Sequence, residues 1–447
     1  MATSRDLLQY LALAGVARPA ALRAELRISA QTLSRLVGEA GEDVYRIGRG
    51  PATQYARTRS VDALGRSLPV FRVDESGEIG PGGTLRLLWE HRTSWERPGG
   101  SELFVELPPA LVDMAPQGYM GHAFSSRYPE LRLPPRLSDW SDDHRLLALA
   151  LRGEDCVGDL VVGDESLRRF LTAPPEDVNP ERYPILARRS VAEPVGSSAA
   201  GERPKFGAFS RGRHVLVKFA PPGDGGAARR WRDLLWCECK ALQVVAAAGR
   251  VASPAQCFDV DGWRFLEVER FDRVGQRGRR GVLSLSALNS EYLGTPDAWT
   301  AAAALLAAPP FFLPAGDAEQ LRWLDVFGQL IGNTDRHFGN VSFFAGSGKA
   351  LRLAPAYDML PMILAPAADV VVARPFEPSA PTGSTLGVWQ DAAEWAQRFW
   401  GEVRDHDELE PDVRAFAEAA ANAVAGMAAR LRPQPSTASV SAAAPRG

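Results

Sequence analysis

The ten residues Ile331-Gly-Asn-Thr-Asp335-Arg-His-Phe-Gly-Asn340 are the stretch of this chain that decides its fold. They follow a stripe of apolar residues at helical spacing and lead into the apolar run Val341–Phe344, which is typical of a strand. After a glycine turn, a second strand is expected, and it leads to Tyr357-Asp358. The pattern predicts a polar loop between a buried helix and a β-hairpin, and the hairpin brings Asp358 back near Asn340.

The spacing of the polar residues in this loop indicates phosphoryl transfer. Asp335 and Asn340 are five residues apart, as in the catalytic loop of protein kinases, where the Asp meets the substrate hydroxyl and the Asn holds Mg²⁺. Asp358 stands where a kinase places a second oxygen ligand for Mg²⁺. Taken alone, the Asp335–Asn340 segment also fits a simple polar turn.

A lysine and a glutamate upstream fit the same interpretation. Lys218 falls on an expected strand, residues 214–219, and Glu238 falls on the apolar face of an expected helix, residues 230–250. A carboxylate on an apolar face needs a partner, so we expect Glu238 to pair with Lys218. Each has a simpler explanation alone, since a strand lysine can reach solvent along its stem and a small rotation of the helix would expose Glu238. Together with the loop, however, the two residues favour a nucleotide site.

The first 60 residues differ in charge from the rest of the chain. They carry nine arginines and five acidic residues, a net charge of +4, whereas the whole chain carries −3. Apolar stripes predict three short helices, and residues 45–59 are typical of a basic β-hairpin. This order predicts a winged helix-turn-helix whose third helix reads DNA with Arg35, while Arg46 and Arg57 contact phosphates. The alternative is a helical module that docks a protein.

The remaining 387 residues divide into regions of different character. We expect an α+β subdomain over residues 62–165, a strand-rich region over 166–300, a mainly helical region over 301–432 and a disordered tail over 433–447. The longest uncharged run is interrupted by prolines, so no membrane span is expected. Four cysteines without a CxxC pair fit a reducing cytoplasm rather than a disulfide scaffold.

On these residues the chain resembles the HipA-like serine/threonine kinases of bacterial toxin–antitoxin systems. The similarity extends over residues 71–432 and is most specific in four segments: the 331–340 loop, Tyr357-Asp358, Val268-Glu-Arg-Phe-Asp-Arg273 and Gly201–Lys205. With its added N-terminal module, the chain is similar to the YjjJ-like branch, which joins a DNA-binding module to the kinase fold. The resemblance implies an α+β, protein-kinase-like two-lobed HipA fold with an N-terminal winged helix-turn-helix. Residues 166–300 would form its N-lobe and 301–432 its C-lobe.

The resemblance also assigns roles to individual residues. Asp335 corresponds to the catalytic base, and Asn340 and Asp358 correspond to the Mg²⁺ ligands. The positions that correspond to ATP-contacting groups are Gly201, Lys205, Lys218, His337 and the hinge residues Glu269 and Phe271. Only four of the 51 basic residues are lysines, and two of those four fall at these positions.

The loop before Lys205 corresponds to the segment that family members autophosphorylate to switch themselves off. Ser198 matches the modified serine, and Ser197 competes for the same role. The loop departs from the family pattern at Arg203 and Pro204, where relatives often carry Gln and Glu.

The implied function is that of a cytoplasmic toxin kinase that uses ATP and Mg²⁺ to phosphorylate serine or threonine of a cellular protein and of itself. Known targets in the family are aminoacyl-tRNA synthetases, and the sequence does not name the target here. DNA would bind through residues 1–60, where a homodimer would suit two half-sites. A separate antitoxin is a further expected partner, unless residues 1–60 supply its role. Two alternatives stay open: a DNA-binding transcriptional regulator with a non-catalytic kinase-like body, and a DNA-acting toxin.

Overall fold

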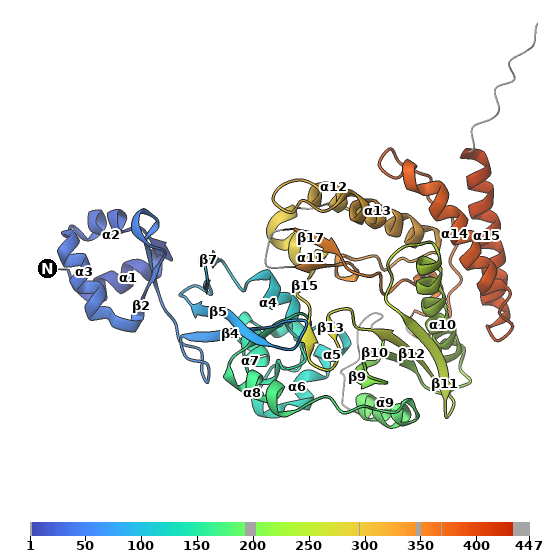
Figure 1. Ribbon diagram of the computed structural model, residues 1–447, viewed down its shortest axis with the longest axis horizontal. Helices are drawn as coiled ribbons and strands as arrows, with labels where there is room; N and C mark the ends of the chain where they lie inside the picture. The colour runs from blue at the N-terminus through green and yellow to red at the C-terminus, as the bar shows by residue number, and fades with distance from the viewer. Residues whose placement is uncertain (1, 193–202, 295, 346–349, 368, 432–447) are drawn as a thin grey trace, which may run out of the picture.

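The computed structural model describes residues 2–192, 203–294, 296–345, 350–367 and 369–431. Figure 1 shows an elongated molecule with the N-terminal helices at one end and the C-terminal helices at the other. The predictions for Ser197, Ser198, Gly201 and the 433–447 tail fall outside the described residues. Within those ranges, no helix is both long enough and apolar enough to cross a membrane.

The N-terminal unit contains the three helices and the hairpin that the sequence predicts. The helices are α1 (Ser4–Ala14), α2 (Pro19–Leu26) and α3 (Ala30–Ala40). The Ser29 side chain caps α3, because its hydroxyl accepts a hydrogen bond from the Thr32 amide (3.1 Å). The hairpin consists of β2 (Val44–Ile47) and β3 (Gln54–Arg57), and β1 (Val16–Ala17) completes a sheet of order β1-β3-β2.

The hairpin joins the N-terminal unit to the rest of the molecule. Ile47 and Ala56 pack against Leu88 in a small apolar cluster. Just after the hairpin, the Arg59 guanidinium donates two hydrogen bonds to the Asp143 carboxylate (2.8 and 2.6 Å). A bidentate pair of this kind fixes orientation as well as distance, so it ties the segment after the hairpin to the residue that carries the carboxylate.

A five-stranded antiparallel sheet of order β7-β6-β5-β4-β8 forms the middle of the molecule. Its strands are β4 (Ser67–Val73), β5 (Ile79–Leu87), β6 (Thr93–Arg97), β7 (Gly100–Phe104) and β8 (Leu160–Val162). The helices of this region are α4 (Pro109–Met114), α5 (Gly118–His122), α6 (Phe124–Arg127), α7 (Asp142–Arg152) and α8 (Asp164–Thr172). α4 and α7 bury Leu111, Leu146 and Leu149 against the sheet.

A second antiparallel sheet carries the candidate site. Its order is β11-β12-β10-β9, with β9 (Lys205–Ser210), β10 (Arg213–Ala220), β11 (Ala255–Val260) and β12 (Trp263–Glu269). α9 (Tyr183–Ala192) covers one face, where Tyr183 packs on aromatic side chains of the strands. The long helix α10 (Gly226–Ala247) covers the other face, where its apolar residues pack against Leu266 and Val268 (Figure 1).

The C-terminal half is mainly helical and contains the largest core. Its helices are α11 (Leu285–Leu288), α12 (Trp299–Leu306), α13 (Ala315–Leu330), α14 (Leu386–Arg404) and α15 (Pro411–Leu431). Two short ladders accompany them: β13 (Arg273–Val274) with β14 (Gly278–Arg279), and β15 (Val282–Ser284), β16 (Ser342–Ala345) and β17 (Leu351–Leu353) in the order β15-β16-β17. The hairpin β16–β17 is the one that the sequence predicts after the polar loop.

A buried ionic cluster fastens the middle region to the end of β12. The Asp272 carboxylate accepts hydrogen bonds from the Arg270 guanidinium (3.0 and 3.1 Å) and from the Gly158 amide (3.0 Å). Arg273 donates to Asp272 (2.6 Å) and to the Asp155 carboxylate (3.0 Å). Burial would raise the pKa of Asp272, but the two guanidinium groups more than offset it, so the pKa lies below its usual range.

Candidate active site

The predicted pair between Lys218 and Glu238 is confirmed. The Lys218 ammonium on β10 lies 2.5 Å from a carboxylate oxygen of Glu238 on α10. The same ammonium also contacts the Asp358 carboxylate, 140 residues further along the chain. Lys218 therefore joins the strand, the helix and the segment after β17 in a single three-residue cluster. Its side chain is 6% exposed and that of Glu238 is 1% exposed, so solvent screens the pair little.

The charges in this cluster determine one another's protonation. Burial would lower the pKa of Lys218, but the Asp358 and Glu238 carboxylates more than offset it, so the pKa lies above its usual value. For Asp358, burial acts to raise the pKa, whereas Lys218 and then Lys205 lower it, with a net pKa of about 2. Burial raises the pKa of Glu238, and the nearby Asp358 charge adds to the rise, while Lys218 offsets only part of it. The two lysines therefore lower the pKa of Asp358 more than burial raises it, whereas for Glu238 burial dominates.

Lys205 lies opposite Lys218 across the β9–β10 ladder. Like charges at directly opposed positions are destabilising unless anions lie nearby. Here Lys205 acts on both Asp358 and Glu238, whose pKa values it lowers. The cluster thus concentrates two ammonium groups on one side of the sheet, which suits an anionic ligand such as a polyphosphate.

The polar loop is held by its own asparagines. The fully buried Asn333 side chain accepts a hydrogen bond from the Asp335 amide (3.0 Å) and donates to the Asp358 carbonyl (3.3 Å). The Asn340 side-chain amide donates to the Asp335 carbonyl (2.8 Å). These bonds fix the backbone on both sides of Asp335, whose side chain is exposed. The loop therefore presents the Asp335 carboxylate to solvent from a rigid frame.

Asp325 on α13 holds the polar loop through Arg336, and the sequence interpretation missed it. This carboxylate on α13 is 2% exposed and accepts hydrogen bonds from the Thr300 amide (3.1 Å) and hydroxyl (2.8 Å). Its other oxygen accepts from the Arg336 guanidinium (3.2 Å), and Arg336 also contacts the Asn333 carbonyl. An acid within the apolar stretch Leu321–Leu330 was the signal that could have identified it, because a buried carboxylate must be satisfied internally.

Tyr357 connects the loop to the hairpin, and it too was not singled out as a site residue. Its hydroxyl donates to the Gly339 carbonyl (2.7 Å) and shares a hydrogen bond with the Ser342 hydroxyl (2.7 Å). The next residue, Asp358, adopts a left-handed backbone conformation (φ 54°), which is uncommon for a residue other than glycine. That turn places Asp358 at Lys218.

The donor set at Asn340 and Asp358 fits the predicted Mg²⁺. Asn340 uses its amide nitrogen on the Asp335 carbonyl, which leaves its side-chain oxygen as the coordinating atom. Asp358 supplies an ionised carboxylate. Mg²⁺ takes one or two protein oxygens of this kind together with substrate phosphates, rather than a full protein cage. Among the described residues, no three or more His, Cys, Asp or Glu side chains are grouped so that they could hold a metal ion.

The predicted adenine-binding hinge lies at the end of β12. The Glu269 amide donates to the Pro254 carbonyl (2.9 Å), so the predicted contact of Glu269 rests on its carbonyl oxygen. The Phe271 ring lies 5.6 Å from the ring of Tyr357, centroid to centroid. His337 is exposed in the polar loop, and its Nδ1 accepts from the Gly339 amide (3.0 Å).

Arg203, which departs from the family pattern noted above, has a structural role. The Arg203 guanidinium stacks on the Trp231 ring at 3.3 Å from its centroid, so the chain just before β9 is tied to α10. Burial lowers the pKa of Arg203 to about 10, while Asp369 acts in the opposite direction. The Pro204 carbonyl accepts from the Phe219 amide (3.2 Å).

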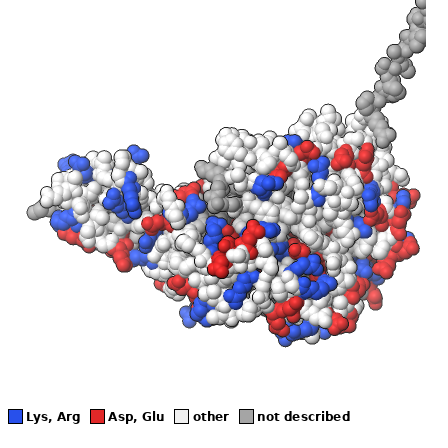
Figure 2. Space-filling view, in the orientation of Figure 1, with Lys and Arg blue, Asp and Glu red and all other residues white. Residues whose placement is uncertain are grey.

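The three predicted DNA-contacting arginines lie in different surroundings. Arg35 on α3 is 55% exposed and contacts only Glu39, on the same helix, among the described groups. Arg46 on β2 is exposed and donates to the Thr53 hydroxyl (3.3 Å). Arg57, by contrast, stacks on the Trp89 ring of the middle region (4.1 Å to its centroid), so it already has a partner within the chain. Figure 2 shows basic side chains over the N-terminal unit and acidic ones along the opposite end.

Comparisons with known proteins agree with this architecture. Residues 64–171 match the family model described as the YjjJ-like toxin, middle domain, and residues 197–430 match the HipA-like C-terminal domain. The toxin YjjJ of Escherichia coli strain K12 is 34% identical over 414 residues, which cover 89% of this chain and 92% of that protein. Among solved structures, the Shewanella oneidensis HipA, determined in a complex with HipB and operator DNA, has a TM-score of 0.50. It is 17% identical and covers 72% of this chain and 84% of its own, and the α+β HipA fold predicted from the sequence is thereby confirmed.

Proposed function

This chain belongs to the HipA-like toxin family, and from that premise we propose that it is a protein kinase that transfers the γ-phosphate of ATP to serine or threonine hydroxyls. The observation that carries the proposal is the cluster of Lys218, Glu238 and Asp358. A non-catalytic body would have no need to bury a lysine between two carboxylates beside an exposed aspartate on a rigid loop.

Each residue has a stated task in this proposal. Bound ATP with Mg²⁺ would supply the phosphoryl group and the charge that neutralises its oxygens. Lys218 and Lys205 bind phosphate oxygens, and Glu238 holds Lys218 in place. Asp358 and Asn340 hold the metal ion, while Asp335 orients the attacking hydroxyl and accepts its proton.

The substrate proposed is a cellular protein, with an aminoacyl-tRNA synthetase as the first candidate and the chain itself as a second target. To test this, the full chain is incubated with radiolabelled ATP and Mg²⁺, with and without a bacterial lysate, and the labelled residues are mapped. We expect label on serine or threonine. Nucleotide binding without transfer would favour the non-catalytic regulator, and DNA cleavage without nucleotide binding would favour the DNA-acting toxin.

A second function, DNA binding through residues 1–60, is proposed from the exposed arginines Arg35 and Arg46. They sit on α3 and on the hairpin, where a winged helix-turn-helix meets the groove and the phosphates. A gel shift with the full chain tests it, and the stoichiometry of the complex tests the expected homodimer. Adding a candidate antitoxin to the same assay tests that further partner. If no DNA is bound even at low salt, the unit is a protein-docking module.

A further inference from the structure

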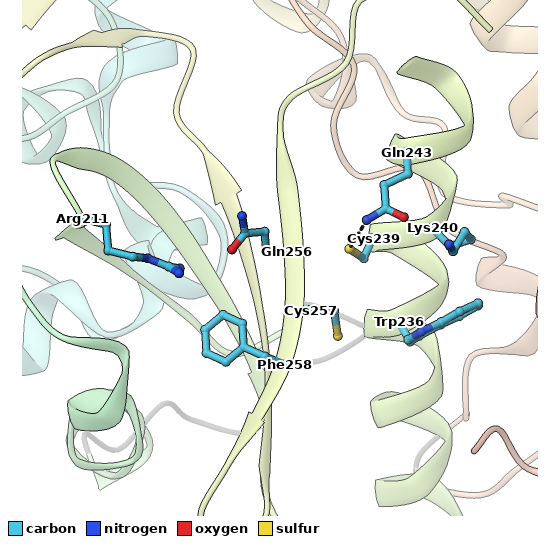
Figure 3. A pocket seen from close by; sticks show the side chains of 8 residues that line it. All are labelled: Arg211, Trp236, Cys239, Lys240, Gln243, Gln256, Cys257 and Phe258. Carbon is cyan, nitrogen blue, oxygen red and sulfur yellow. Dashed lines mark hydrogen bonds between the residues drawn. The ribbon is translucent and has the colours of Figure 1, made fainter. Parts of the chain in front are cut away.

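A groove of about 500 Å³ lies on the outside of the second sheet, away from the cluster around Lys218. Figure 3 shows that strand β11 runs through its middle. The side chains of Arg211, Gln256 and Phe258 lie on one side of the strand, whereas those of the facing helix α10 lie on the other. The groove is therefore built around a strand edge and is not a closed pocket.

β11 is the terminal strand of its sheet, and no other strand pairs with its outer side in the part of the chain that the structure describes. The Glu269 amide donates to the Pro254 carbonyl, so these two residues direct their main-chain groups toward each other. In an antiparallel ladder, residues that face the paired strand alternate with residues that face away from it. Ala255 and Cys257 thus direct their main-chain groups outward. The backbone of Cys257 meets the thiol of Cys239, which is only a weak acceptor.

The open edge has a defined length. Beyond it, Arg232 of α10 donates to the Asp259 carboxylate (3.0 Å) and contacts the Gly262 carbonyl, so that end is covered. The segment from Ala255 to Phe258 is what remains. An exposed strand edge of this kind is a template for pairing with another chain unless it is covered.

The placement of the groove residues selects the shape of the ligand. A compact molecule lies on one side of β11 and meets only one of the two sets of side chains. An added strand meets both, because its side chains alternate between the two faces of the sheet. We propose that the edge of β11 binds an extended segment of a partner protein, which pairs with Ala255 and Cys257 and places alternate side chains on the two sides.

The polar groups beside the edge indicate the chemistry of that segment. Two of them are cations, Arg211, with a side chain 46% exposed, and Lys240, 24% exposed, and the side-chain amides of Gln243 and Gln256 can both donate and accept. Arg211 contacts Glu267 and Lys240 pairs with Glu402 (2.9 Å), so both cations are held in position by their own carboxylates. A segment bearing Asp or Glu side chains at alternate positions complements these donors.

The chain's own tail does not match this chemistry. Residues 432–447 contain two arginines and no Asp or Glu. A segment from another protein is therefore the occupant that the charges favour.

The groove is separate from the cluster of Lys218, Glu238 and Asp358. Trp236, Lys240 and Gln243 recur at helical spacing and so share one face of α10, with Lys240 and Trp236 also in cation–π contact (5.4 Å). Glu238 falls on the opposite face by the same periodicity. Binding at β11 can therefore be measured without reference to phosphoryl transfer.

The test uses short random peptides displayed on phage and selected on the full chain. Selected sequences are synthesised with a fluorescent label, and their dissociation constants are measured by anisotropy. We expect acidic residues at alternate positions. Cys257→Pro removes an outward amide at a position where an edge strand tolerates proline, and it should weaken binding about tenfold or more. Arg211→Gln should weaken binding in the same direction, and the peptide should slow hydrogen exchange at Ala255 and Cys257.

The matched control is Arg168→Gln, which removes a similarly exposed arginine from α8 and should leave peptide binding unchanged. If Cys257→Pro does not fold, Arg211→Gln and Lys240→Gln decide the matter. The proposal is overturned if no peptide binds, or if bound peptides are indifferent to all three groove variants. It is also overturned if peptides bind only after residues 432–447 are deleted, because the tail would then be the occupant.

Discussion

The cluster of Lys218, Glu238 and Asp358 and the exposed arginines of the N-terminal unit are built in opposite ways. Lys218 is buried between two carboxylates, and removing Lys218 leaves both Glu238 and Asp358 without the ammonium that they share. Arg35 and Arg46 are exposed and make single contacts with groups of their own unit. A buried charge that loses its partner is costly, whereas an exposed charge is solvated and its ion pairs contribute little to stability. The two regions should therefore respond differently to the same kind of substitution.

The largest effect on stability is expected for Lys218→Ala. The change leaves Glu238 buried without its ammonium partner and should lower the free energy of unfolding by ~3–5 kcal/mol. Lys240→Ala is the matched control, since that lysine pairs with Glu402 nearer the surface and should cost less than ~1 kcal/mol. Chemical denaturation of both variants measures the difference. Equal losses would mean that Lys218 is not a buried partner.

Asp358→Ala should change ATP affinity in a metal-dependent manner. With Mg²⁺ present, we expect affinity to fall about tenfold, or ~1.4 kcal/mol, because one of the two proposed protein oxygen ligands is lost. With a chelator present, the ATP affinity should change little, because Asp358 then has no metal ion to hold in either protein. Calorimetric titrations under both conditions test this. The same loss with and without Mg²⁺ would remove Asp358 from the metal site.

On the N-terminal surface, Arg46→Ala should weaken binding to specific and random DNA alike. Each phosphate contact contributes about −0.9 to the log–log dependence of affinity on salt, so the slope should become shallower by roughly that amount. Arg35→Ala should instead reduce the difference in affinity between specific and random DNA, as expected of a residue that contacts a base edge. Gel shifts over a salt series measure both. An unchanged slope for Arg46→Ala would exclude a phosphate contact there.

The smallest effect is expected for Arg57→Ala. This variant tests whether Arg57 stabilises the junction with the middle region or contacts DNA. Loss of the stack on Trp89 should destabilise the hairpin by ~0.5–1 kcal/mol. Hydrogen exchange of the β3 amides should speed up in this variant and stay unchanged in Arg46→Ala. If Arg57→Ala weakens DNA binding as much as Arg46→Ala does and leaves exchange unchanged, the guanidinium serves DNA and not the junction.

The contrast also explains what could be predicted from the sequence. The Lys218–Glu238 pair was predictable because a carboxylate on an apolar helix face requires a cation, and the nearest strand supplied one. The contact between Lys218 and Asp358 was not predictable. These residues are 140 positions apart, and the contact depends on where the β16–β17 hairpin places Asp358. The helices and hairpin of the N-terminal unit followed from caps and apolar spacing.

Other features depended on neighbours that the pattern does not reveal. Arg57 counted as one more basic residue of the hairpin, and only the fold brings Trp89 to it. Asp325 lay in an apolar stripe without an evident partner, because Arg336 and Thr300 reach it from two other segments. The open edge of β11 follows from strand order, which single-strand propensity does not encode.

The most direct test of the central claim compares phosphate transfer by the full chain and by Asp335→Asn, with ATP affinity and thermal stability measured on the same samples. The change is nearly isosteric at an exposed position, so the fold and ATP binding should be unaffected. Transfer should fall by about 10²–10⁴, the contribution of a positioned general base. Transfer at the wild-type rate by Asp335→Asn would contradict the account.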